Sequence, residues 1–452
     1  MTKSMTEGEP AKLIFLFTLP LLAGNIFQQL FAFVDTLIVG RCLGVEALAA
    51  VGCTGSLMFL MLGFIIGLTS GLSIRTGQHF GARDEDGIRQ SVVACTLLSL
   101  IAGVVLTVVG VMSCRWLLIL LETPPEILEG AHDFISIIFG ANLVFIFLNM
   151  QTNIIRALGD SKTPTLIMAY GLMLNIILEP VAIIVLDWGI PGAAIATVFS
   201  QFVGCVATFV HIYRKLPVLH TKPDDWHWNG KVIREHLKIG LPMAVQTSII
   251  AIGACLLQFS LNGLGSTAVA AFSASQKVDT LAFMPMMSFG LAMAAYTAQN
   301  YGARKFSRIE EGVKKCIYMS GGFSLVAGAA IIFLGTDIMY LFVGDGQEDV
   351  IRYGREYLIV NAACYWILSL LFIYRYTLQG LGKSMVPTIA GIMELIMRTV
   401  AALFLVDKLG YLGACLASPL AWLGACVPLG VSYYRTRGDL RRRAEMEKES
   451  FV

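Results

Sequence analysis

The stretch ALGDSKTPT, residues 157–165, returns as GLGKSMVPT at residues 380–388. Three other stretches of the first half reappear in the same order in the second half: LPLLAGN at 19 as LPMAVQT at 241, GQHFGARD at 77 as AQNYGARK at 298, and GIPGAAIAT at 189 as GYLGACLAS at 410. The partners are always 221 to 223 residues apart. A single match would be weak, but four in one order at one separation indicate a duplicated unit.

The composition is that of a membrane protein. Hydrophobic residues make up 56% of the 452 residues, charged residues 14%, and the mean hydropathy is +0.72. A water-soluble globule of this length carries more charge on its surface, so these values favour a polytopic membrane protein. The net charge of +2 is too small to suggest binding to nucleic acid.

Twelve apolar runs are long enough to cross a bilayer, which takes about 20 residues for a hydrocarbon core of about 30 Å. Their length and the lack of period-two alternation favour helices over barrel strands. The runs are 13–40, 47–74, 91–112, 134–155, 164–187 and 190–213 in the first half, and 239–262, 268–298, 313–334, 355–380, 386–406 and 411–434 in the second. The sequence therefore predicts an all-α polytopic membrane protein with twelve transmembrane helices in two homologous six-helix bundles.

These spans set the predicted domain boundaries. An N-terminal lobe covers 1–213, a linker 214–238, a C-terminal lobe 239–434 and a basic tail 435–452. Because six is an even number, each lobe begins and ends on one side of the membrane, and the lobes form parallel repeats about a pseudo-twofold axis along the membrane normal. Basic residues concentrate on the side that holds both termini, the linker and the tail, so we expect that side to be cytoplasmic.

Two homologous bundles that face each other can open a shared cavity to either side of the membrane, which is the geometry of alternating access. We find no selectivity-filter motif of a channel, no catalytic constellation of a membrane-embedded lipid-modifying enzyme and no GxxxxGK[ST] loop for ATP. The sequence therefore favours transport driven by an ion gradient. Acids inside the spans are the residues that such coupling needs.

The stretch NIILEP, residues 175–180, holds one of these acids. Asn175 and Glu179 are four residues apart, so on a helix they share a face about 6 Å apart along the axis and can grip one ion. We expect Pro180 to kink the helix and to free a backbone oxygen beside Glu179. The alternative is that Glu179 lies near the membrane interface and extends toward it.

The second half lacks this pair at the corresponding positions and carries Lys277, Asp279, Glu394 and Arg398 in its spans instead. Glu394 and Arg398 are four residues apart with opposite charges, which favours a structural ion pair within the lobe. The alternative for this charge network is a second protonation site or a site that contacts substrate.

Together these motifs resemble the multidrug and toxic compound extrusion family of cation-coupled exporters, whose superfamily also moves lipid-linked sugars. The resemblance covers nearly the whole chain and lies in VDTLIVGRCLG from 34, GQHFGARD from 77, RALGDSKTP from 156, NIILEP from 175 and their second-half partners. It implies two six-helix lobes arranged in a V around a central cavity. It also implies exchange of Na⁺ or H⁺ for amphipathic, often cationic organic compounds.

The resemblance further implies a coupling site in the N-terminal lobe, as in the prokaryotic members of the family. The positions that match are Asp35, Asn175, Glu179 and Thr197. The residues alone leave alternatives: Asp35 could pair with Arg41, and Thr197 could bond back to its own helix. The family commonly has Asp where this chain has Glu179, and the extra methylene changes the ion geometry.

The coupling ion stays open between Na⁺ and a proton. Two carboxylates, an amide oxygen and a hydroxyl suit Na⁺, but two acids close together in a low dielectric also favour a shared proton. No other cofactor is expected, and the partners would be small organic substrates and membrane lipids, with no nucleic acid.

The expected function is thus cation-coupled export by an antiporter, not enzymatic catalysis. We expect a multi-pass protein of a prokaryotic plasma membrane that functions as a monomer. The alternative is a flippase for a lipid or lipid-linked oligosaccharide, whose cavity should be strongly basic to hold a pyrophosphate. Lys277 and Arg398 are the candidates for such a role here.

Overall fold

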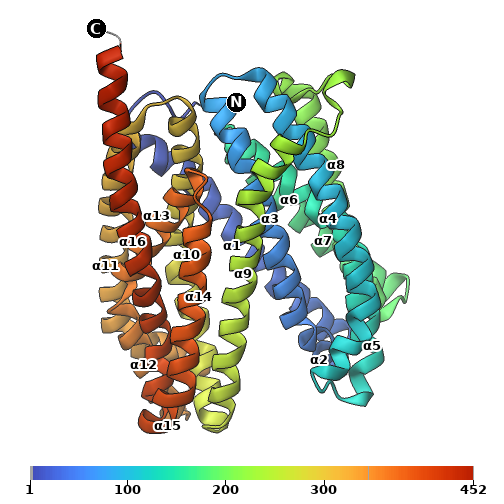
Figure 1. Cartoon of the computed structure of the whole chain (residues 1–452). Helices are drawn as coiled ribbons and strands as arrows, with labels where there is room; N and C mark the ends of the chain where they lie inside the picture. The colour runs from blue at the N-terminus through green and yellow to red at the C-terminus, as the bar shows by residue number, and fades with distance from the viewer. Residues whose placement is uncertain (1–3, 345, 451–452) are drawn as a thin grey trace. The chain divides into compact units, whose positions relative to one another are not determined.

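The computed structural model describes residues 4–344 and 346–450, and every regular element in that part of the chain is a helix (Figure 1). Ten of the described helices are long and apolar enough to cross a membrane alone, and two bent helix pairs bring the number of spans to twelve when each pair counts as one. The predicted all-α fold is confirmed. Helices satisfy their own backbone groups, which is what the hydrocarbon core of a membrane demands.

Contacts divide the described residues into two compact units. The first unit comprises Ala23–Ala244, and the second comprises Ser4–Leu22 together with the chain from Val245 onward. Both divisions fall inside long helices, α1 (Pro10–Leu43) and α9 (Gly230–Asn262), each two residues after the proline of an LP motif. Each of these two helices therefore contributes to both units, at matching positions of the repeat.

The first unit packs its helices around a core that includes Ile65, Leu72 and Ile146. Two of its helices, α5 and α6, form one span that bends by 47° at Ala141. Besides its parts of α1 and α9, the unit contains α2 (Val45–Cys53), α3 (Gly55–Gly81), α4 (Glu85–Leu120), α5 (Pro125–Gly140), α6 (Asn142–Ala157), α7 (Lys162–Pro180), the π-helical turn η1 (Val181–Val185), α8 (Gly189–Lys215), and the 3-10 turns η2 (Pro217–Leu219) and η3 (Pro223–Asp225).

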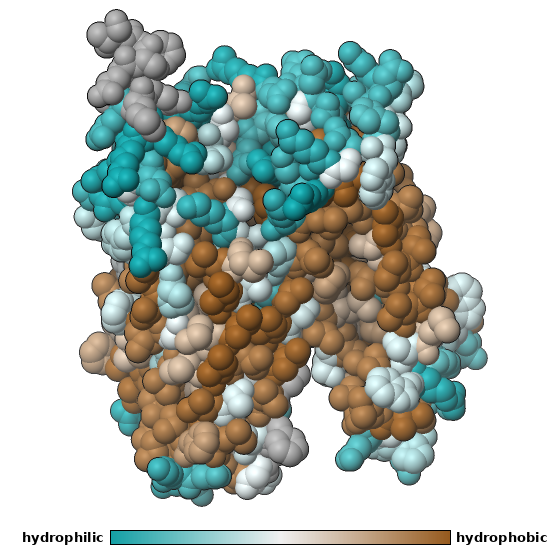
Figure 2. All heavy atoms as spheres, in the orientation of Figure 1, coloured by the Kyte–Doolittle hydropathy of each residue, from teal (hydrophilic) through white to brown (hydrophobic). Residues whose placement is uncertain are grey.

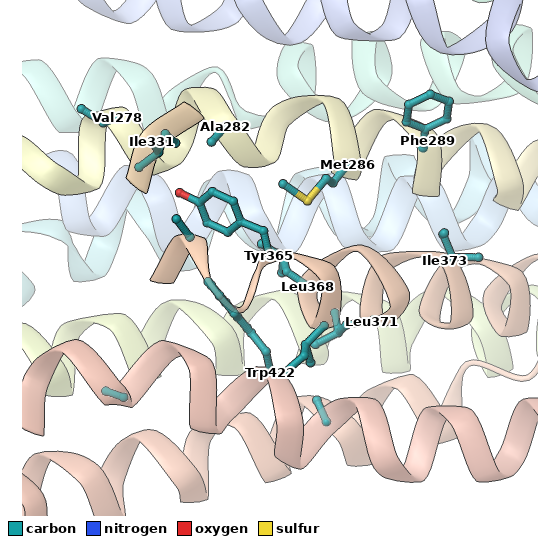
Figure 3. Close-up of a cluster of buried hydrophobic side chains, with 14 of the residues drawn as sticks. Val278, Ala282, Met286, Phe289, Ile331, Tyr365, Leu368, Leu371, Ile373 and Trp422 are labelled. Carbon is teal, nitrogen blue, oxygen red and sulfur yellow. The ribbon is translucent and has the colours of Figure 1, made fainter. Parts of the chain in front are cut away.

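The second unit has its own core, part of which Figure 3 shows around Met286, Leu368 and Trp422. Its span α12–α13 bends by 49°, and Ala363 and Cys364 lie at the break. The unit contains α10 (Ser266–Gly302), α11 (Phe306–Val343), α12 (Glu348–Ala362), α13 (Tyr365–Gly380), α14 (Met385–Val400), the π-helical turn η4 (Ala401–Leu405), α15 (Val406–Leu409) and α16 (Tyr411–Ser450).

Large apolar side chains cover the outer faces of the helices. On α4, for example, Val105, Val109 and Met112 are all exposed, and Met112 is 80% exposed. Figure 2 shows hydrophobic residues along the helices and hydrophilic residues gathered at the helix ends. Such faces are unfavourable in water but suit contact with lipid chains, so each unit has the surface of a membrane protein.

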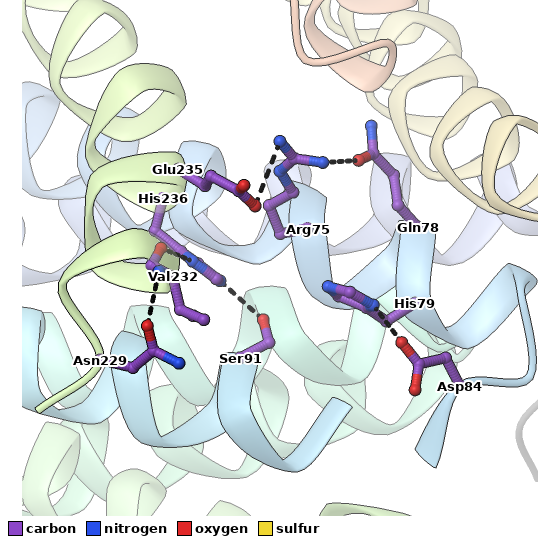
Figure 4. A network of polar contacts seen from close by, with 9 residues as sticks. All are labelled: Arg75, Gln78, His79, Asp84, Ser91, Asn229, Val232, Glu235 and His236. Carbon is purple, nitrogen blue, oxygen red and sulfur yellow. Dashed lines mark hydrogen bonds and ion pairs between the residues drawn. The ribbon is translucent and has the colours of Figure 1, made fainter. Parts of the chain in front are cut away.

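The first part of α9 is tied to α3 and α4 (Figure 4). His236 forms a hydrogen bond of 2.7 Å with Ser91 of α4, and Glu235 pairs with Arg75 of α3 at 3.5 Å. The backbones also approach closely, because a Cβ on Gly71 of α3 would lie 2.5 Å from the Cα of Gly240. Glycine is what allows this approach.

The GARD motif forms the turn between α3 and α4, with Arg83 at a positive φ of 57°. Asp84 caps α4 by accepting a hydrogen bond of 2.9 Å from the backbone N–H of Gly87, and this bond holds the pKa of Asp84 below its usual range. His79 lies 2.8 Å from the same carboxylate (Figure 4). The motif therefore serves as a structural turn.

Candidate functional site

Helix α7 has one apolar outer face and one polar inner face. Met173 and Ile177 are exposed on the outside, whereas Asn175 and Glu179 are fully buried, each with 0% exposure. The two polar residues lie one turn apart on the same helix, as the sequence spacing requires. The alternative that Glu179 extends toward the membrane interface does not fit its complete burial.

Two other helices bring Asp35 and Thr197 to this inner face. The amide Nδ2 of Asn175 donates a hydrogen bond of 3.3 Å to Oγ1 of Thr197 on α8, and that hydroxyl donates one of 3.3 Å to Oδ1 of Asp35 on α1. Asp35 and Glu179 are close enough for their carboxyls to interact electrostatically. The structure thus gathers all four residues within the first unit, and Thr197 does not bond back to its own helix.

Several oxygens at this site have no amide or hydroxyl donor among the described residues. Oδ1 of Asn175 and both carboxylate oxygens of Glu179 are buried without such a donor, and the group in reach of Glu179 is another acid, Asp35. A buried polar atom without a partner costs about 1–3 kcal/mol, and more when it carries charge. Orphaned oxygens of this kind call for an ion, a proton or a water molecule that the protein itself does not supply. The oxygen atoms of Asp35, Asn175, Glu179 and Thr197 can bind any of these.

Pro180 marks a change of helix type. The α-helical hydrogen bonding of α7 ends at Pro180, and the chain continues directly into the π-helical turn η1 (Val181–Val185). A π-helical turn is rare and often lies at a functional site. Because proline lacks the N–H that would bond to a carbonyl one turn earlier, the disturbance lies directly beside Glu179.

The charged residues predicted in the second half do not form one network. Glu394 on α14 pairs with Arg375 on α13, both of them buried, and not with Arg398. Nε of Arg398 is buried without a hydrogen-bond partner among the described residues. Lys277 is exposed on α10. Asp279 is buried and accepts hydrogen bonds from two tyrosines of the same unit.

Sequence reasoning missed three side chains that hold these acids. Arg375, Tyr357 and Tyr365 all lie inside the predicted span 355–380. A charged residue within an apolar span was the signal for Arg375. The two tyrosines gave no comparable signal, because tyrosine is common in membrane helices and its partner depends on how the helices pack.

Comparison with known families covers most of the chain. The model of the MatE family matches residues 20–181 and 242–404, which are the two repeats. A relative from Bacillus subtilis, "Probable multidrug resistance protein YoeA", is 29% identical over 418 residues that cover 89% of either chain. "Probable multidrug resistance protein YpnP" of the same organism is 27% identical over 380 residues, 84% of either chain.

Solved structures show the same fold. One described as "Outward-facing conformation of a multidrug resistance MATE family transporter of the MOP superfamily" has a TM-score of 0.89 and 23% identity, and covers 98% of this chain and 99% of that one. The twelve-helix fold predicted from the sequence is therefore that of known transporters. With both repeats matched by the family model, this chain belongs to the MatE family of multidrug efflux transporters.

Proposed function

We propose that this protein is a cation-coupled antiporter that exports amphipathic, often cationic organic compounds by alternating access. Asp35, Asn175, Glu179 and Thr197 would bind the coupling ion, which is Na⁺ or a proton. We place the protein in a prokaryotic plasma membrane, with both termini in the cytoplasm and the monomer as the working form. The basic residues of the loops, the linker and the tail support that orientation.

The observation that carries the proposal is the set of orphaned oxygens on α7. Oδ1 of Asn175 and the two oxygens of Glu179 are buried, lack an amide or hydroxyl donor among the described residues and lie in the same cluster as the carboxylate of Asp35. In low dielectric the interaction of two neighbouring carboxyls is strong, so the cluster is costly without a cation and stable with one. The free energy of this cluster therefore depends on whether an ion is bound, and such a dependence is required to couple ion binding to export.

The steps of transport follow from this dependence. When the site opens to the outside, an ion enters and lowers the negative charge of the carboxyl pair by one. The state that binds the organic compound then loses stability relative to the state that binds the ion. When the site opens to the cytoplasm, the ion leaves and the acids again favour a cationic compound nearby. A coupling ion can drive export only through this difference in affinity between the two states.

Loss of either acid tests the proposal in cells. Asp35→Asn and Glu179→Gln keep the shape of the side chain and remove its charge. Each should abolish resistance to cationic compounds in a drug-hypersensitive host that expresses the protein in its membrane at the normal level.

Asp187→Asn is the matched control. Asp187 is an exposed acid eight residues beyond Glu179, and its positive φ of 52° is one that Asn tolerates. Resistance should stay at the wild-type level in this variant. Full resistance in both Asp35→Asn and Glu179→Gln would refute the assigned coupling site.

A further inference from the structure

The last helix of the second unit continues well beyond its predicted span. The apolar run 411–434 predicts the membrane part of α16, whereas the helix itself runs on to Ser450 (Figure 1). The corresponding helix of the first unit, α8, ends at Lys215, which is the counterpart of Thr436 at the repeat separation of 221 residues. The part of α16 from Thr436 onward is therefore an extension that the first repeat does not have.

One face of this extension packs on the start of α11. Leu440 is 7% exposed and forms a small apolar cluster with Phe306 and Ile309 of α11 and with Leu381, which follows α13. Leu440 lies six residues beyond the predicted end of the span, about 9 Å along the helix axis, and thus outside the hydrocarbon core of the membrane. The second unit therefore has a packed end of its own on the aqueous side.

A cavity of about 300 Å³ remains between α11 and α16 at this end. Sites for small molecules have volumes of about 300–1,000 Å³. The cavity has apolar side chains on one part of its wall and charged groups on another, and the residues that matter here are Phe306, Ile309, Leu440, Glu310, Arg437 and Arg441. It can therefore hold a group that is itself apolar at one end and charged at the other.

Two arginines at the cavity share a single carboxylate. Arg441 donates hydrogen bonds of 2.7 and 2.5 Å to the two oxygens of Glu310, and Arg437 donates to one of the same oxygens. Each guanidinium has five N–H donors, so one carboxylate leaves donors unused and one positive charge in excess. Glu445 also lines the cavity, but it is exposed and acts on Arg441 only through space. Nε of Arg437 is buried without an acceptor among the described residues, and such a donor calls for an acceptor from outside the protein.

The depth of these donors favours a lipid over a soluble anion. Arg437 is three residues beyond the predicted span, about 4.5 Å along the helix axis, which falls in the headgroup layer of a bilayer. Anionic phospholipids of the cytoplasmic leaflet carry a phosphate group in that layer, with their apolar chains directly below it. The tail lies on the side that we propose to be cytoplasmic.

We propose that this cavity binds the headgroup of an anionic phospholipid. The phosphate contacts Arg437 and Arg441, and the adjoining part of the lipid packs against Phe306, Ile309 and Leu440. The phosphate oxygens accept the N–H groups that Glu310 leaves unused, as bonds between charged partners. The bound lipid thus joins the extension of α16 to the start of α11. The site lies in the second unit and does not depend on the coupling site proposed in the first.

Thermal unfolding of the purified full chain in detergent tests this proposal without a transport assay. Dihexanoyl phosphatidylglycerol is the anionic probe, dihexanoyl phosphatidylcholine has the same chains and no net charge, and glycerol phosphate has the phosphate and no chains. A ligand that binds the folded state raises the unfolding temperature as its concentration increases, which yields an apparent Kd. We expect a clear rise with phosphatidylglycerol and little or none with the other two at equal concentrations.

Three variants assign the effect to the cavity. Arg437→Gln should raise the apparent Kd for phosphatidylglycerol about tenfold, because a hydrogen bond between charged groups is lost. Glu310→Gln frees both guanidiniums and should lower that Kd, although it also breaks the ion pairs between α11 and α16. Arg442→Gln is the matched control, because Arg442 is exposed on the same helix and does not line the cavity. The Kd of this variant should equal that of the wild type.

The opposite effects of the first two variants distinguish a lipid site from ion pairs that only hold the helices together. Equal rises in unfolding temperature with phosphatidylcholine or with glycerol phosphate would overturn the proposal. An unchanged Kd in Arg437→Gln or weaker binding in Glu310→Gln would do the same, and Glu310→Gln decides the matter if Arg437→Gln does not fold. An equal loss of binding in Arg442→Gln would show unspecific attraction to the basic tail instead of a site in the cavity.

Discussion

Thr197 connects the two halves of the proposed coupling site. Its hydroxyl accepts a hydrogen bond from Asn175 and donates one to Asp35, so it orients an amide from one helix and a carboxylate from another. A hydroxyl that both accepts and donates is well suited to this position. The second repeat has Ser418 at the corresponding place, without an acid or amide at the positions of Asp35 and Asn175, which are Leu257 and Arg398.

Removal of this hydroxyl should weaken coupling. Thr197→Ala breaks both hydrogen bonds, and a loss of about 1.4 kcal/mol corresponds to a roughly tenfold fall in the rate of ion-driven efflux from proteoliposomes. Thr197→Ser keeps the hydroxyl and should retain most of the activity. The matched control is Thr208→Ala on the same helix, because Thr208 is buried and bonds back to Gly204. Equal rates for Thr197→Ala and Thr208→Ala would contradict the role of Thr197.

The pair of Arg375 and Glu394 should matter for stability. Glu394→Ala leaves a buried guanidinium without its partner, which costs about 3–5 kcal/mol. We therefore expect a clear fall in the thermal unfolding temperature of the purified protein. Asp349→Ala breaks the exposed pair of Asp349 and Arg352 on α12 and should have less than about 1 kcal/mol of effect. Similar shifts in the two variants would contradict this interpretation.

The residues of the first-unit site could be named from the sequence, whereas the ion-pair partner of Glu394 could not. Intramembrane acids and amides are rare, and the resemblance to a known family pointed to the same positions. For Glu394, the spacing of four residues favoured Arg398 on the same helix. The structure pairs it with Arg375 of the neighbouring helix instead. The spacing of residues predicts contacts within one helix. It does not indicate which side chain of a neighbouring helix will form an ion pair with Glu394.

At the scale of elements, the spans follow the hydropathy of the sequence, and their breaks do not. Gly140 and Ala141 lie at the bend of α5–α6, whereas Ala363 and Cys364 lie at the bend of α12–α13, which has neither proline nor glycine. A glycine is a common cause of a sharp bend, so the sequence carries a signal for the first bend and none of this kind for the second. A π-helical turn follows Pro180, but the second repeat forms the turn η4 (Ala401–Leu405) directly after Val400, so proline alone does not explain these turns.

The close contact of α3 with α9 should be sensitive to a single added methyl group. Gly71→Ala places a methyl group 2.5 Å from the backbone of Gly240, so α9 must shift away from α3, and overpacking of this kind costs about 1–3 kcal/mol. We expect a lower thermal unfolding temperature for the purified protein. Gly52→Ala on α2 is the control, because its Cβ meets nothing within 4 Å. That change should be neutral or slightly stabilising. A Gly71→Ala protein as stable as Gly52→Ala would refute the close contact.

At the scale of the whole molecule, the two repeats share a helical plan and differ in where they bury acids. The first unit gathers Asp35 and Glu179 from α1 and α7, and the second buries Asp279 between α10, α12 and α13. The duplicated fold could be predicted because its motifs recur at one separation. The division of α1 and α9 between the units is not visible in those motifs, since it depends on contacts between distant parts of the chain.

Cation coupling at the first-unit site can be measured as ion-driven efflux by the reconstituted protein. Proteoliposomes are loaded with a cationic dye, and its efflux is measured under a Na⁺ gradient alone and then under a pH gradient alone. The wild-type protein should respond to one of these gradients, Asp187→Asn should respond equally, and Asp35→Asn and Glu179→Gln should fall to the rate of protein-free liposomes. Efflux that needs neither gradient, or that persists in both acid variants, would contradict cation coupling at this site.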